Sequence, residues 1–156
     1  MENKMQINTR IFGEITVDQN RVITFVNGLV GFPDLKDFLL IHDLEKGLGA
    51  GIQWLQSVQE PAFAIPVIDP LSVMESYNPQ VEDELLATVG DFTEDEMLVM
   101  VTISVPSDIT RMTVNLKGPI IINAVTRKAC QLIAEGEGYE VKFPVYEILK
   151  ARKVGE

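Results

Sequence analysis

Residues 98–105 form the run LVMVTISV, the clearest guide to the architecture of the chain. Every odd-numbered position in the run holds Val or Ile, and the polar residues Thr102 and Ser104 stand between them. Side chains of a β-strand alternate between its two faces, so this spacing predicts a strand with one entirely apolar face. β-Branched residues also favour strands over helices.

The same kind of pattern recurs along the chain. The run MQINTRI at 5–11 alternates in the same way. Further short apolar runs are FLLIHDL at 38–44, IQWLQSV at 52–58 and AFAIPVI at 62–68. Pro66 lacks a backbone donor, which predicts that its strand lies at a sheet edge or at a bulge. Frequent turn signals and few helix signals indicate a mostly antiparallel barrel or sandwich. Of these two we expect a mainly β fold, a small antiparallel β-barrel-like single domain with one or two short helices, which is the form that the family resemblance described below implies.

The chain is expected to fold as one domain over residues 1–156, with a core at about 5–145 and a polar tail at 146–156. It opens on polar residues in place of an apolar signal-peptide segment, and its longest uncharged run is too short for a membrane helix. The single cysteine, Cys130, cannot form an internal disulfide, and it is expected to be a small buried residue. These features predict a cytoplasmic protein without membrane association.

Acidic residues dominate the charge of the chain, and their placement is uneven. The formal net charge is −10, and residues 47–110 carry eleven acids without a single Lys or Arg. Residues 111–156 instead carry eight bases against five acids. An acidic surface repels phosphates, so we expect no direct binding of nucleic acid, whereas a basic protein partner would be attracted. The alternative is an ordinary solvated surface without a dedicated partner.

The sequence contains no evident constellation of catalytic or metal-binding residues. His42, the single histidine, adjoins Asp43, but neighbouring strand residues point to opposite faces and do not make an acid–base pair. His42 and Cys130 have no recognisable metal-ligand spacing. The cluster GLGAG at 47–51 resembles a phosphate loop, but the strand-like run after it lacks the helix N-terminus that would bind the anion. We therefore predict no catalytic residues, no metal and no cofactor.

A second glycine-containing stretch, GLVGFPDL at 28–35, is expected to be a shaped bend rather than a ligand loop. Gly28 and Gly31 tolerate positive φ angles, and the proline that follows forces an extended conformation on the residue before it. We expect the side chains of Leu29 and Phe32 to anchor this bend in the core.

The stretch FVNGLVGFPDLKDFLLI, residues 25–41, resembles the N-terminal signature of the flagellar assembly factor FliW family. Four further segments agree with this family in the same order, namely WLQSVQEPAFAIPVIDP, SYNP, VTISVP and TVNLKGPIIINAVTRKACQLI. The resemblance covers nearly the whole chain, about residues 5–145. Its specificity comes from the combination of LQS, the following FAIPVIDP and the later NLKGPIIIN.

The resemblance implies a β-barrel-like fold, no enzymatic activity and two protein partners. FliW proteins bind flagellin, the filament subunit, and CsrA, a small basic RNA-binding regulator that represses flagellin translation. A family member that binds CsrA relieves this repression, and flagellin frees CsrA by occupying the antagonist. The acidic surplus of the present chain suits a basic partner of that kind.

Recognition residues are expected in the loop DPLSVMESYNP at 69–79 and in the acidic run after it, because loops on a rigid barrel commonly carry binding. The partner-binding candidates are Asp69, Glu75, Tyr77, Asn78, Glu82, Asp83 and Glu84. In the alternative, Asp69 and Asn78 only shape turns before prolines, and Tyr77 belongs to the core.

Two other classes of function stay open on the sequence alone. A β-barrel of this size can enclose a cavity, so a small-ligand-binding β-barrel protein is the alternative to a partner-binding regulator. An enzyme is the third class, and the missing nucleophile–base pair weighs against it. We expect Asn115 and Asn123 to have a structural role in any of these, satisfying backbone groups at the ends of the barrel.

Overall fold

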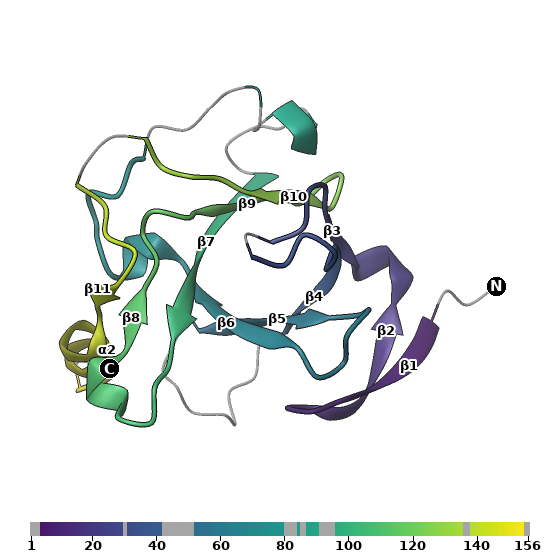
Figure 1. The fold of residues 1–156 in the computed structure, drawn as a ribbon, viewed down its shortest axis with the longest axis horizontal. Helices are drawn as coiled ribbons and strands as arrows, with labels where there is room; N and C mark the ends of the chain where they lie inside the picture. Colours follow the sequence, from purple (N-terminus) through teal and green to yellow (C-terminus); the bar gives the residue numbers. More distant parts are fainter. Residues whose placement is uncertain are drawn as a thin grey trace.

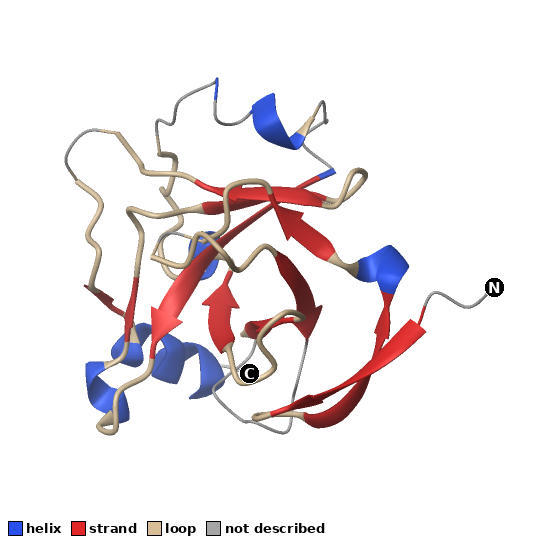
Figure 2. Ribbon diagram, turned by 45° about the vertical axis from the view of Figure 1, so that its right-hand side comes forward, coloured by secondary structure: helices blue, strands red, loops and turns tan. Residues whose placement is uncertain are grey.

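Strands are the main regular secondary structure of the molecule (Figure 1, Figure 2). The computed structural model describes residues 4–29, 31–41, 52–79, 84, 87–90, 96–135 and 138–154. The strands are β1 (Lys4–Thr9), β2 (Gly13–Asp18), β3 (Ile23–Phe25), β4 (Asp37–Ile41), β5 (Gln53–Ser57), β6 (Ala64–Ile68), β7 (Met97–Ser104), β8 (Thr113–Val114), β9 (Ile120–Asn123), β10 (Lys128–Gln131) and β11 (Phe143–Pro144). The helices within the described ranges are the α-helix α2 (Tyr146–Val154) and the 3₁₀ helices η1 (Gln19–Arg21), η3 (Pro70–Ser72), η4 (Ala87–Val89) and η6 (Ile109–Arg111).

Seven strands close into a barrel in the order β7, β6, β5, β4, β3, β10, β9, with β9 pairing back onto β7. These pairings are antiparallel except that of β3 with β10, which run parallel with Phe25 opposite Ala129. β8 pairs with β7 outside this ring, and β11 pairs with β8. The predicted mainly β, barrel-like fold is confirmed, and ring closure gives each of the seven strands a pairing partner on either side over at least part of its length.

Apolar side chains from alternate strand positions fill the barrel. Phe25 and Phe38 are fully buried, and their rings meet edge to face with centroids 5.2 Å apart. Met100 of β7 belongs to this core cluster, whereas its neighbour Val101 packs in a second cluster on the other side of the strand. β7 therefore buries apolar side chains on both of its faces, where the alternation in 98–105 predicts only one.

The hairpin of β1 and β2 is a separate two-stranded sheet beside the barrel (Figure 1). Ile7 and Val17 of the hairpin form a small apolar cluster with Leu39 of β4. Phe12, at the turn of the hairpin, lies edge to face with Trp54 of β5 at 5.8 Å between centroids. The half-buried strand predicted near the N-terminus is therefore confirmed, and its buried face is the one that covers the barrel.

The bend at 28–35 has the predicted backbone. The φ angle is +72° at Gly28 and +90° at Gly31. Leu29 and Phe32 exchange two backbone hydrogen bonds, with N···O distances of 3.3 and 2.8 Å. Leu29 is buried in the barrel core, as expected.

The prediction that Phe32 is anchored in the core is wrong, because its side chain is 46% exposed. Its ring lies against that of Phe63 at 4.8 Å between centroids, and Phe63 in turn contacts the core ring of Phe38 at 6.2 Å. Phe63 thus stands between Phe32 and the barrel interior, so that Phe32 forms an outer layer.

The prediction that the strand of Pro66 lies at a sheet edge or at a bulge is wrong for the strand as a whole, since β6 has a neighbouring strand on each side. Pairing of β6 with β7 begins only at Val67, however, whereas Pro66 lies opposite Trp54 of β5. Pro66 therefore has a strand partner on one side only, which is where a residue without an N–H is tolerated.

Residues 146–154, which belong to the segment expected to be a polar tail, form the helix α2. Its residues Ile148 and Leu149 pack against the buried cluster that contains Val145. This packing gives the helix a stabilising contact despite its four charged residues, Glu147, Lys150, Arg152 and Lys153.

Several sequence predictions fall outside the described residues, namely those for His42, Asp43, the cluster GLGAG at 47–51, Glu82 and Asp83. Among the residues that are described, no helix has both the length and the apolar character needed to span a membrane.

Candidate functional site

Two grooves meet at the short helix η3, so the loop predicted to carry recognition is a wall of both. The apolar groove has a volume of about 470 Å³ and is lined by Asp69, Pro70, Leu71, Tyr77, Asn78, Pro79, Met97, Leu98, Val99, Met100, Pro119 and Ile121. The acidic groove has a volume of about 890 Å³ and is lined by Asp69, Leu71, Ser72, Val73, Glu75, Glu147, Ile148 and Ala151.

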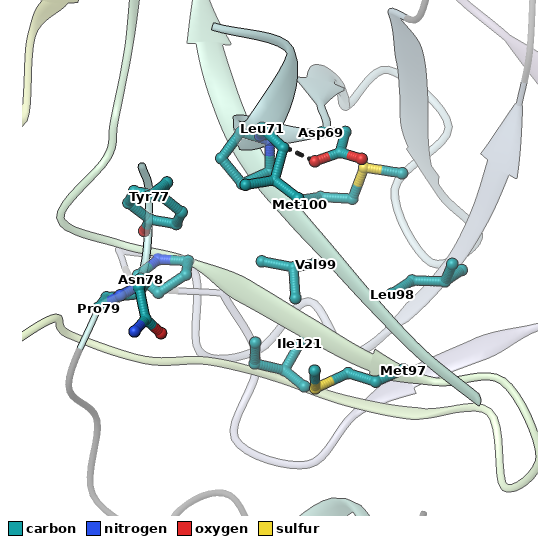
Figure 3. A pocket seen from close by; sticks show the side chains of 12 residues that line it. Asp69, Leu71, Tyr77, Asn78, Pro79, Met97, Leu98, Val99, Met100 and Ile121 are labelled. Carbon is teal, nitrogen blue, oxygen red and sulfur yellow. Dashed lines mark hydrogen bonds between the residues drawn. The ribbon is translucent and has the colours of Figure 1, made fainter. Parts of the chain in front are cut away.

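One wall of the apolar groove is formed by barrel strands. Val99 of β7 and Ile121 of β9 are opposite each other in the strand register, and they face Tyr77, Asn78 and Pro79 across the groove (Figure 3). Both strands carry apolar residues at consecutive positions, so one face supplies the barrel core and the other supplies this wall. The groove therefore rests on a rigid sheet rather than on loops alone.

The rim that the two grooves share is a capped turn. The Oδ1 atom of Asp69 accepts a 2.9 Å hydrogen bond from the backbone N–H of Leu71, and Pro70 occupies the first helical position. Both features favour the start of a helix at this place. The side chain of Leu71 is left 53% exposed between the grooves. An exposed leucine on a fixed turn is suited to anchor a partner.

Tyr77 fixes the far end of the same loop. Its side chain is buried, and its hydroxyl donates a 2.6 Å hydrogen bond to the carbonyl oxygen of Leu116. Burial, and after it the nearby Tyr139, raise the pKa of Tyr77 above its ordinary value. The two tyrosine rings meet edge to face at 4.8 Å, and the Tyr139 hydroxyl accepts a 2.9 Å hydrogen bond from the backbone N–H of Asn78. The loop is thus held at both ends, which preorganises the groove.

Carboxylates give the acidic groove its character. Asp69 and Glu75 come from the loop and Glu147 from α2, and no Lys or Arg occurs among the described residues that line the groove. Apolar side chains, including the buried Val73 and the partly buried Ile148, lie between them. A lining of three carboxylates favours a partner that presents cationic side chains, and its attraction is screened over about 8 Å at physiological salt.

The structure brings together four of the seven predicted partner-binding residues, namely Asp69, Glu75, Tyr77 and Asn78. Asp69 also shapes its turn, and Tyr77 is also part of the core, so the structural alternative holds for these two residues as well. Glu84 is exposed and lines neither groove, and Glu82 and Asp83 lie outside the described residues.

Sequence reasoning missed Leu71, Val99, Ile121 and Glu147. A signal for the strand residues was available, because LVMV at 98–101 and III at 120–122 are apolar at consecutive positions. A strand of that kind is covered on both faces, so its outer face needs a partner of some sort. No local signal identifies Glu147, because its place in the groove depends on how α2 packs.

Asn115 and Asn123 have the structural role that was predicted. The buried Asn123 donates from Nδ2 to the carbonyl oxygen of Val89 at 3.0 Å and accepts at Oδ1 from the N–H of Val125 at 2.9 Å. Asn115 accepts at Oδ1 from the N–H of Lys117 at 3.1 Å. Both asparagines therefore satisfy backbone groups at turns between strands.

The chemistry of the two grooves is that of a contact surface. The part of the chain that the structure describes holds no group of three or more His, Cys, Asp or Glu side chains able to bind a metal ion. Cys130 is buried, as predicted, and burial raises the pKa of its thiol, which disfavours a nucleophilic thiolate. What the grooves present is an exposed leucine, aliphatic strand residues and carboxylates, the groups that recognise helices and basic segments.

Comparison with known proteins gives a consistent result. A family model described as FliW protein matches residues 6–145. The flagellar assembly factor FliW of Lachnospira eligens is 47% identical over 147 residues, which cover 94% of this chain and 97% of that protein. The flagellar assembly factor FliW of Lachnoclostridium phytofermentans is 44% identical, with 95% of each chain covered. A crystal structure of the flagellar assembly factor FliW matches with a TM-score of 0.82 and 28% identity, over 91% of this chain and 97% of that one. The chain therefore belongs to the FliW family.

Proposed function

We propose that the chain is a flagellar assembly factor without enzymatic activity, which binds flagellin and antagonises the translational regulator CsrA. By occupying CsrA it relieves the repression of flagellin synthesis. The observation that carries the proposal is the pair of unlike grooves that meet at Leu71, one apolar and one acidic. Their chemistry corresponds to the two partners that the family resemblance implies.

The apolar groove suits an amphipathic helix, the form in which we expect flagellin to dock. Such a helix places apolar residues three and four positions apart into a hydrophobic groove. The strand wall offers the half-buried Val99 beside the buried Ile121, and Leu71 offers an exposed anchor at the rim (Figure 3). Asn78 is exposed at the opposite rim, where it supplies polar groups for orientation.

The acidic groove suits CsrA, which is basic because it binds RNA phosphates. Glu75 is exposed, and together with Asp69 and Glu147 it gives this lining a formal charge of −3, one for each carboxylate. Attraction between surfaces of opposite charge mainly raises the rate of association and suppresses wrong partners. The CsrA interaction should therefore depend on salt more strongly than the flagellin interaction does.

The shared rim gives a physical reason why the partners would compete. Asp69 and Leu71 belong to the linings of both grooves, so a partner that covers one groove restricts access to the other. Flagellin bound in the apolar groove would then release CsrA from the acidic one.

Calorimetric titration of the purified protein with flagellin and with CsrA tests the proposal. Leu71→Ser should weaken flagellin binding roughly tenfold or more, as expected for an interface anchor. Glu75→Gln combined with Glu147→Gln should weaken CsrA binding and reduce its dependence on salt. Val125→Ser and Glu14→Gln are matched controls, because these exposed residues line neither groove.

If the protein binds neither flagellin nor CsrA, the proposed function is refuted as a whole. If both partners bind but the groove variants behave like the controls, the function stands and the assignment of the grooves is wrong.

A further inference from the structure

A further pocket, of about 660 Å³, lies at one end of the barrel. Its lining comes from strand ends that the pairing brings together, including the first residue of β3, the last three residues of β4, and the start of β7 beside the end of β9. Strand β2 of the separate hairpin adds Ile15 and Thr16. The volume falls within the range of about 300–1,000 Å³ that is typical of small-molecule sites.

The walls of this barrel-end pocket are continuous with the barrel core. Ile23 and Ile122 belong to the core cluster, and Leu40 packs against it. Leu98 lies opposite Ile122 in the register of β7 and β9, and its side chain is 40% exposed. A ligand with an apolar tail could therefore cover side chains that are otherwise left partly in contact with water.

Two arginines stand at the same pocket, in a chain whose net charge is −10. Arg21 and Arg127 both line it and are exposed, and neither has an ion-pair partner among the described residues. The pocket has one carboxylate, that of Asp18, which accepts a 2.9 Å hydrogen bond from the N–H of Asn20 and caps η1. Two cations against one anion leave a local charge of +1, which favours an anionic ligand.

Arg127 has an unusual backbone as well as a suitable charge. Its φ angle is +57°, and it is the one non-glycine residue with positive φ among those the structure describes. Glycine adopts this conformation at a lower cost, so the backbone alone does not favour an arginine here. The turn is held by backbone groups, since the N–H of Arg127 donates to Asn123 at 2.8 Å and its carbonyl accepts from Thr24 at 2.9 Å. The guanidinium is therefore available for a role other than folding, as strained residues at functional sites often are.

We propose that this barrel-end pocket binds a small anionic amphiphile, a carboxylate with an unbranched apolar tail. The tail lies along Leu40, Ile41 and Leu98, apolar lining residues that are not buried, and the carboxylate lies between the guanidinium groups of Arg21 and Arg127, which bind carboxylates well because of their planar donor geometry. The inference does not depend on the binding of flagellin or CsrA. Of its lining residues only Leu98 also contributes to the apolar groove, and none contributes to the acidic groove.

Titration of the full chain with sodium decanoate, followed by calorimetry and by backbone amide NMR shifts, tests this site. We expect saturable binding, with the largest shifts at the start of β3, the end of β4 and the end of β9. Arg127→Gly should weaken decanoate binding by roughly fivefold or more while leaving the melting temperature unchanged or higher, because glycine suits the positive φ angle. Arg21→Gln should weaken binding similarly. The neutral analogue 1-decanol should bind more weakly than decanoate.

Two further variants make the test specific. Arg111→Gln removes an exposed arginine at η6, away from this pocket, and should not affect decanoate binding. Ala124→Trp places a large ring at an exposed position of the lining and should block binding. The proposal is overturned if decanoate does not saturate, if decanol binds as tightly as decanoate, or if Arg111→Gln weakens binding as much as Arg127→Gly. If Ala124→Trp fails to fold, the comparison of the arginine variants still decides.

Discussion

Replacing Gly28 by alanine should destabilise the protein more than the same change at Gly31, although both glycines have positive φ angles. The two residues lie in one bend and lose the same hydrogen atom on substitution, so they form a matched pair. They differ in surroundings. A Cβ atom at Gly28 would lie 2.6 Å from both the carbonyl carbon and the Cα of Pro33 and would also strike the Pro33 oxygen, whereas a Cβ atom at Gly31 meets nothing within 4 Å.

The expected magnitudes follow from these two terms. Positive φ costs an alanine about 1–2 kcal/mol relative to the right-handed conformations, and this applies to both positions. The contact with Pro33 is with backbone, which cannot rotate away, and overpacking of this kind costs about 1–3 kcal/mol more. We therefore expect a loss of about 2–5 kcal/mol for Gly28→Ala and about 1–2 kcal/mol for Gly31→Ala.

Urea denaturation of the two variants and the parent, followed by the fluorescence of the single tryptophan, measures these differences in the free energy of unfolding. Thermal melting is a second measure, because each kcal/mol lowers the midpoint by about 2–4 °C in a chain of this length. Equal losses for the two variants would refute the argument from the Pro33 contact. A Gly31→Ala variant as stable as the parent would refute the argument from positive φ.

Three further predictions concern the buried groups and the acidic surface. Tyr77→Phe should cost about 1–2 kcal/mol, because the buried carbonyl of Leu116 loses its donor. Because folding raises the pKa of Tyr77, its contribution to the free energy of unfolding is complete below a pH of about 10, where the unfolded phenol titrates, and is lost as the pH rises further. Urea denaturation at increasing alkaline pH should therefore show a smaller loss of stability for Tyr77→Phe than for the parent. Cys130 should react with a thiol reagent at neutral pH only as fast as the protein opens, so a rate that is unchanged by added denaturant would contradict its burial. Replacing Glu75, Glu82, Asp83 and Glu84 together by Gln or Asn should weaken CsrA binding at low salt, with less effect on flagellin binding and none on folding. Equal losses of affinity for both partners, measured by interferometry, would contradict this prediction.

The mainly β class of the fold was predictable because it depends on local sequence patterns. The alternation in 98–105 and the glycines of the bend are short-range signals, and the structure has a strand and two positive φ angles where they predict them. The closure of the barrel was less accessible. The parallel pairing of β3 with β10 depends on two three- to four-residue strands that are far apart in sequence, and nothing local specifies such a partner.

The sequence predictions for Phe32 and for residues 146–154 missed how these residues pack in the folded protein. Phe32 is apolar enough for the core, but the ring of Phe63 already occupies the position beneath it. The helix α2 carries four charged residues among its nine, and the packing of Ile148 and Leu149 shows which of the others are held against the core. Tertiary packing of this kind overrides local composition.

The candidate site was predictable in part. Charge and an aromatic residue within one loop were sufficient to indicate Asp69, Glu75, Tyr77 and Asn78. The facing wall of Val99 and Ile121 was not, because apolar strand residues are ordinarily assigned to a core. Which of these residues line a groove follows from how the loop at 69–79 packs over strands β7 and β9, and that is a property of the whole fold.

The parallel seam between β3 and β10 also constrains how the protein is made. Phe25 and Ala129 are about a hundred residues apart in the chain, so a ribosome has to deliver most of the polypeptide before the seam can form. Until then β4, β5 and β6 can pair with one another as a meander, but that sheet keeps an open edge and an uncovered apolar face. The loop closed by the seam adds an entropic cost of order (3/2)RT ln n, and pairings this distant are slow. Newly synthesised chains should therefore pass through an aggregation-prone interval whose length is set by translation of the segment up to β10, and a cell that needs the protein quickly would depend on chaperones during that interval.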